Sequence, residues 1–169
     1  MDRKREEEYD EMTQRLLEQP VLVIDFLPER VPAERAEAYF ALERFCLEPE
    51  RLNGLYRRFA RLLAKLSAYA DMAAWDGETW TEPVRPDELT HKIEACAGGG
   101  FLNVLLPGED SLVTLSSGDL YMTLYRPSEN IKRIAAALAA SEGLFAREGT
   151  APDGAASDRD RDGKGGKMR

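Results

Sequence analysis

The sequence predicts an α+β domain, in which a small, mostly antiparallel sheet packs against two or more helices, followed by a disordered C-terminal tail. Three observations support this class. A long amphipathic pattern with helical period spans residues 49–70, and three short strand-like runs separated by turn residues occupy 101–125. From Gly149 onward the chain carries too little apolar surface to offset the entropy of ordering. We therefore expect one domain over 1–148 and a disordered tail over 149–169.

The first two elements are a helix and a strand. Residues 2–18 are rich in helix formers and carry a thin apolar stripe, which Pro20 closes. The apolar run of residues 20–27 is too short for a typical helix and is bounded by Pro28, which predicts a buried strand.

Residues 38–47 fit either type of element. Tyr39, Leu42 and Cys46 share one side of a helix, whereas Phe40, Leu42 and Phe45 suit the alternating pattern of a strand. We favour a strand that forms a hairpin with the run at 20–27.

The pattern at 49–70 predicts the main helix of the core. Eight of its apolar residues fall on one arc at about 100° per residue: Leu52, Leu55, Tyr56, Phe59, Leu62, Leu63, Leu66 and Tyr69. A second helix begins at Pro86 and ends at the glycines 98–100. A third covers about 127–142 and ends at Gly143.

Three consecutive strands, 101–106, 111–115 and 120–125, form an antiparallel meander. Residues 144–147 can add an edge strand. We expect the helices at 49–70 and 127–142 to cover this sheet.

The composition excludes several classes of function. The formal charge of −8 opposes attraction to nucleic-acid phosphates, so no nucleic-acid partner is expected. The charged start of the chain and the lack of a long apolar run predict a cytoplasmic protein that does not bind membranes. Cys46 and Cys96 lie inside apolar patterns and are expected to act as small hydrophobic residues rather than as a disulfide or metal ligands.

No catalytic residue, metal site or cofactor is predicted. His91 is the only histidine and is expected on the solvent side of its helix. In the tail, Asp158, Asp160 and Asp162 match the start of an EF-hand loop, but its twelfth position is Arg169 instead of the bidentate Glu. We interpret that run as a solvated charged tract.

Two surface features are candidate sites for a protein partner. The first is a basic stripe on the main helix, formed by Arg57, Arg58, Arg61 and Lys65. Its alternative role is to pair with the acidic first helix or to face solvent. The second is the segment 75–86, whose Trp75 and Trp80 either form a binding hot spot or cap the core.

Residues 120–129, Leu-Tyr-Met-Thr-Leu-Tyr-Arg-Pro-Ser-Glu, and 23–28, Val-Ile-Asp-Phe-Leu-Pro, resemble segments of a group of small bacterial cytosolic proteins without an assigned function. The similarity extends over the folded part. It implies no activity and no functional residue.

The function that these observations favour is that of a non-catalytic binding or regulatory domain that acts through a protein partner. One alternative is a small enzyme or ligand-binding protein whose site forms around His91 and the segment 75–86. A second alternative, an immunity or antitoxin protein, fits the small size and the acidity of the chain.

Overall fold

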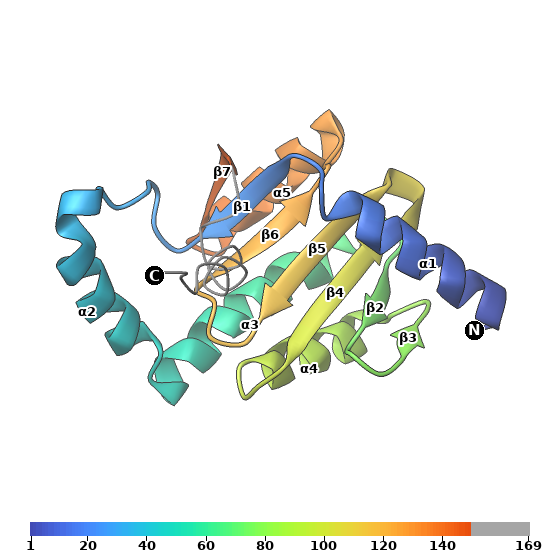
Figure 1. Ribbon diagram of the computed structural model, residues 1–169, viewed down its shortest axis with the longest axis horizontal. Coiled ribbons are helices and arrows are strands. Elements are labelled where there is room, and N and C mark those ends of the chain that lie inside the picture. The colour runs from blue at the N-terminus through green and yellow to red at the C-terminus, as the bar shows by residue number, and fades with distance from the viewer. Residues whose placement is uncertain (150–169) are drawn as a thin grey trace, which may run out of the picture.

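The computed structural model describes residues 1–149. Within them the chain forms five α-helices and a seven-stranded antiparallel sheet, which confirms the α+β prediction (Figure 1). The expected tail, with its acidic run, lies outside the described residues apart from Gly149.

The helices are α1 (Arg3–Leu16), α2 (Ala36–Cys46), α3 (Pro49–Leu66), α4 (Pro86–Cys96) and α5 (Glu129–Ser141), and short 3-10 turns precede α2 at Ala33–Arg35 and β5 at Pro107–Glu109. The strands are β1 (Val21–Asp25), β2 (Ala73–Trp75), β3 (Trp80–Thr81), β4 (Phe101–Leu106), β5 (Ser111–Ser116), β6 (Tyr121–Tyr125) and β7 (Phe145–Gly149).

The strands are ordered β3-β2-β4-β5-β6-β1-β7 across the sheet. The predicted meander is confirmed as β4-β5-β6, and the predicted edge strand is confirmed as β7. β1 lies between β6 and β7, with Asp25 opposite both Tyr121 and Phe145. The N-terminal strand is therefore held by two strands from the C-terminal part of the domain.

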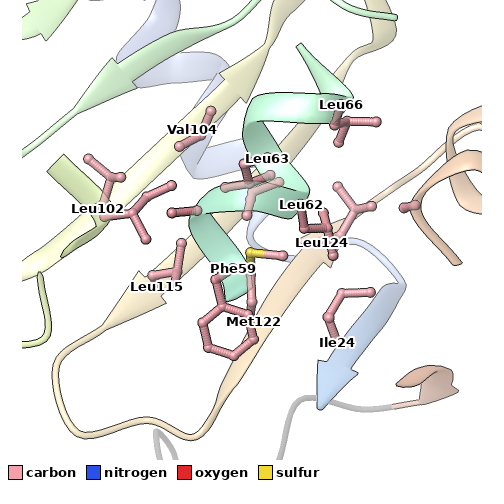
Figure 2. Packing of buried hydrophobic residues seen from close by; sticks show 14 of the residues in the cluster. Ile24, Phe59, Leu62, Leu63, Leu66, Leu102, Val104, Leu115, Met122 and Leu124 are labelled. Carbon is pink, nitrogen blue, oxygen red and sulfur yellow. The ribbon is translucent and has the colours of Figure 1, made fainter. Parts of the chain in front are cut away.

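The main core lies between one face of the sheet and the helices α3, α4 and α5. Seven of the eight residues of the predicted arc lie in this core, where Phe59, Leu62 and Leu63 pack against side chains from β1, β4, β5 and β6 (Figure 2). These side chains are at most 2% exposed. The eighth residue, Tyr69, follows the end of α3 and is 59% exposed, so the prediction is wrong for this residue. A helix with a leucine-rich side buries its apolar area by packing that side on a sheet. The predicted covering helices at 49–70 and 127–142 are therefore confirmed as α3 and α5.

The opposite face of the sheet carries a second, smaller core under α1. Tyr9 and Leu16 of α1 pack with Ala73, Leu105 and Leu112, which come from β2, β4 and β5. In Figure 1, α1 crosses in front of the sheet while α3 and α4 lie behind it. The sequence predicted the helix but not that it covers this second face.

The prediction of a strand at 38–47 is wrong. These residues form α2, and β1 takes β6 and β7 as its neighbours, which leaves no edge of β1 for a hairpin partner. The half-buried residues Tyr39, Leu42 and Cys46 follow the helical spacing i, i+3, i+7. Alanine, glutamate and leucine between the aromatics also favour a helix locally.

Two short strands that the sequence did not predict lie at the start of the segment 75–86: β2 ends at its first residue, and β3 lies inside it. β2 and β3 form a hairpin around Asp76, whose Oδ1 accepts hydrogen bonds from the backbone N–H groups of Glu78 and Thr79, both at 3.1 Å. This is the local turn chemistry that Asp supplies. Among the helices of residues 1–149, none is long and apolar enough to cross a membrane.

Candidate functional site

Helix α2 projects from the body of the domain at one end of the sheet (Figure 1). Not one of its eleven residues is buried. It is attached mainly at its C-terminal end, where Cys46 and Leu47 pack against the main core. There the guanidinium of Arg51 also lies 3.7 Å from the centroid of the Phe45 ring and donates to the Phe45 carbonyl at 3.4 Å. The rest of the helix reaches away from the sheet.

The outward side of α2 is largely apolar. Six residues of this helix are exposed, and four of them have apolar side chains. Ala38, Ala41 and Phe45 share one side of the helix, which we call the α2 apolar face. The fourth, Phe40, lies about 140° around the helix axis from Phe45. Phe40 is 55% exposed and Phe45 is 51% exposed. The other two exposed residues, Glu37 and Arg44, lie between Phe40 and the α2 apolar face around the helix axis.

A cleft of about 370 Å³ lies beside α2, between this helix, the loop that leads to it and the ends of β1, β6 and β7. Asp25, Tyr121 and Arg147 contribute from the strands, and their side chains point to the same face of the sheet because successive residues of a strand alternate sides. Tyr39 and Phe40 contribute from the helix. α1 packs farther along the same face, over β2, β4 and β5.

An ion pair forms part of the wall of this cleft. Nη2 of Arg147 donates to Oδ2 of Asp25 at 2.7 Å, and Oδ1 of Asp25 accepts from the backbone N–H of Leu27 at 3.2 Å. Both side chains are largely buried. Nε of Arg147 is also buried and finds no partner within residues 1–149. Asp25 is thus the described group that neutralises this guanidinium.

The remaining polar groups of the cleft are mostly acidic. Glu29, Glu43 and Asp119 line it, and none of them forms an ion pair with another residue of the described part. Burial raises the pKa of Asp119, the negative charge of Glu43 raises it further, and a hydrogen bond with Tyr121 acts in the opposite direction. Burial, with a further contribution from Asp119, raises the pKa of Tyr121 to about 12. Tyr121 therefore stays neutral at neutral pH.

The basic stripe predicted on the main helix faces acids of the protein's own helices. Arg61 Nε and Lys65 Nζ contact the two carboxylate oxygens of Glu142 at 2.7 and 2.8 Å. Arg57 lies 3.9 Å from Glu94 of α4. Glu142 follows α5, and its side chain is only 7% exposed. The alternative that pairs this stripe with the first helix is wrong, because α1 packs on the other face of the sheet.

Arg58 is the fourth member of the stripe and forms no ion pair within the described chain. Its guanidinium lies beside the backbone of Gly143, which follows α5 and has a φ of +70°. The stripe as a whole therefore lies where α3 contacts α4 and the end of α5.

The two tryptophans support the second core. Trp80 is 8% exposed, its Nε1 donates to Asp10 Oδ1 at 3.0 Å, and its ring meets that of Tyr9 edge-on at 5.3 Å. Trp75 is half-buried and lies 5.8 Å from Trp80 between ring centroids. This placement is what the core-cap interpretation predicts.

His91 is exposed on α4. Neither His91 nor the segment 75–86 lines the cleft beside α2. The candidate site residues that the sequence predicted therefore do not line the cleft.

The sequence does not reveal this site because the residues of the site are distant in the chain. Asp25, Asp119 and Arg147 come together only through the pairing of β1 with β6 and β7. One local signal was available: as a helix, residues 36–46 place Ala38, Ala41 and Phe45 on one side and Tyr39, Leu42 and Cys46 on the other.

Comparisons of the chain with models of protein families, with curated proteins and with solved structures gave no match.

Proposed function

We propose that this protein is a non-catalytic binding domain that acts through a protein partner, and that the partner docks on α2. The observation that carries the proposal is the pair of exposed phenylalanines on α2, Phe45 in the α2 apolar face and Phe40 on the side of the cleft. Both are more than half exposed, on a helix that has no buried residue. Exposed aromatic side chains are unusual on a surface helix, and aromatic residues supply much of the binding energy at protein interfaces.

The attachment of α2 fits this role. A helix held at one end leaves several of its sides open, so that a partner can contact the α2 apolar face and also Phe40 beside the cleft. An apolar helix face lying against a partner is a common way of recognising a peptide or a helix. The stripe on α3 fits less well, because three of its four cations already contact acids of the same chain.

The partner that matches this surface is a basic one. The cleft beside Phe40 is lined by four carboxylates and two guanidiniums among the described residues. One carboxylate and one guanidinium neutralise each other, and the remaining groups are mainly acidic. Charge complementarity therefore favours a positively charged segment of the partner protein.

The test compares two surface variants of the full chain. Phe40→Ser/Phe45→Ser removes both aromatics from α2, and Tyr69→Ser removes an aromatic of similar exposure, 59%, from the segment after α3. Each tagged variant is used to capture proteins from the native cells, and captured proteins are quantified against the wild type. The melting temperature of each variant is measured alongside.

We expect at least one protein to be captured by the wild type and by Tyr69→Ser but lost from Phe40→Ser/Phe45→Ser. All three proteins should melt cooperatively, and the double variant should lose only about 1 kcal/mol, mainly through the contact of Phe45 with Arg51. The proposal is overturned if a folded double variant captures the same proteins, in the same amounts, as the wild type.

A further inference from the structure

The geometry points to the cleft beside α2 as the pocket that receives an arginine side chain of the partner. This inference rests on the proposed function, since it assigns the chemistry of the group that enters beside α2. Phe40 lines the cleft and is 55% exposed. A partner segment that contacts Phe40 therefore has its side chains within reach of the opening.

The charges of the cleft favour a cation. Glu43 projects from α2, and Asp119 precedes β6, so that carboxylates approach the cleft from both walls. Neither has a cationic partner in residues 1–149. Glu29 adds a third carboxylate from the loop before α2. A partly enclosed carboxylate is stabilised most by a cation that also donates hydrogen bonds to it.

Two cations line the cleft, Arg30 and Arg147, against four carboxylates. Arg147 is held by Asp25 at 2.7 Å, and its Nε is buried. An anionic ligand would have to compete with Asp25 for this guanidinium and would meet the negative charge of Glu43 and Asp119. The cleft is therefore matched to a positive group rather than to a phosphate or a carboxylate.

The aromatic residues favour arginine among the cationic side chains. Tyr39 and Phe40 come from α2, and Tyr121 comes from β6 across the cleft. A guanidinium stacks on aromatic rings and donates two parallel hydrogen bonds to a carboxylate, whereas an ammonium is a more strongly hydrated point charge. A volume of about 370 Å³ is ample for one such side chain.

The test uses N-acetyl-arginine amide as a probe, with N-acetyl-citrulline amide as its uncharged analogue of nearly identical shape. Each is titrated into the ¹⁵N-labelled full chain, and backbone amide shifts are followed by NMR. Glu43→Gln/Asp119→Asn is the test variant. Glu37→Gln/Glu88→Gln is the control, because it removes two carboxylates from helices without touching the cleft.

We expect the arginine probe to cause saturable shifts around Tyr39, Glu43 and Tyr121, and the citrulline probe to cause none at the same concentration. The cleft variant should bind the arginine probe at least about tenfold more weakly than the control variant does. Equal binding of the two probes, equal binding by the two variants, or no shift at the cleft would each overturn the inference.

The capture experiment with Phe40→Ser/Phe45→Ser separates the two proposals. If capture depends on the phenylalanines but the arginine probe does not bind, the partner docks on α2 without filling the cleft, and only the inference fails. If the probe binds but capture does not depend on the phenylalanines, the docking surface is wrong while the cleft remains a cation site.

Discussion

At the residue scale, Glu142 is the carboxylate that joins α3 to the end of α5. Its buried side chain contacts both Arg61 and Lys65, so its removal leaves two cations without their partner. We expect Glu142→Gln to lower the free energy of unfolding by about 1–2 kcal/mol, below the range for a fully buried pair because the cations are about half exposed.

Urea unfolding of Glu142→Gln beside Glu94→Gln measures this difference. Glu94 contacts Arg57 at 3.9 Å and is exposed, so its substitution should change stability by no more than about 0.5 kcal/mol. Equal effects of the two substitutions would contradict the role given to Glu142.

Asp76 predicts a dependence of stability on pH. Its Oδ2 accepts a hydrogen bond from Lys92 at 2.7 Å, and this contact, with the backbone donors of Glu78 and Thr79, lowers its pKa from 3.8 to about 2. Between these two values the unfolded chain binds more protons than the folded one, so the folded state loses stability as the pH falls.

We therefore expect wild type to be more stable than Asp76→Asn above about pH 4 and to lose that advantage progressively toward about pH 2. Unfolding free energies of both proteins across this range give the comparison. A constant difference across the range would mean that Asp76 does not titrate with a lowered pKa in the folded state.

At the element scale, α1 is the cover of the second sheet face, and two adjacent leucines test this. Leu16 is fully buried against this face, whereas Leu17, the next residue, is 40% exposed. Leu16→Ala should cost about 2–5 kcal/mol because it leaves a cavity, and Leu17→Ala should stay within about 0.5 kcal/mol. Similar unfolding free energies of the two variants would mean that α1 is not packed on the sheet.

The elements that could be predicted are those with strong local patterns. The arc of α3, the glycines after α4 and the turns between β4, β5 and β6 are readable because each residue's environment follows from its near neighbours. The hairpin β2-β3 has only three and two residues per strand, too few for a pattern of alternation.

α2 shows why the site itself could not be predicted. Its aromatic residues resemble those of a strand, and the evidence against a strand is that β6 and β7 already occupy both edges of β1. The same long-range pairing assembles Asp25, Tyr121 and Arg147 in the cleft. Such contacts depend on the order of strands in the sheet, which local patterns do not encode.

At the scale of the whole molecule, the sheet is covered by three helices on one face and by α1 on part of the other, and α2 stands at the end of that second face (Figure 1). This arrangement leaves α2 and its cleft together as a surface with exposed aromatics and, among the described residues, more carboxylates than guanidiniums. Docking of a basic partner on α2 is the central functional claim.

Site-specific photo-crosslinking in the native cells tests this claim most directly. A photoreactive phenylalanine analogue placed at Phe40 should form a covalent adduct with a different protein, through a peptide that contains arginine, while the same analogue at Tyr69 should not form that adduct. An adduct at Phe40 with a second copy of the chain or with its own residues 150–169, or the same adducts from both positions, would contradict it.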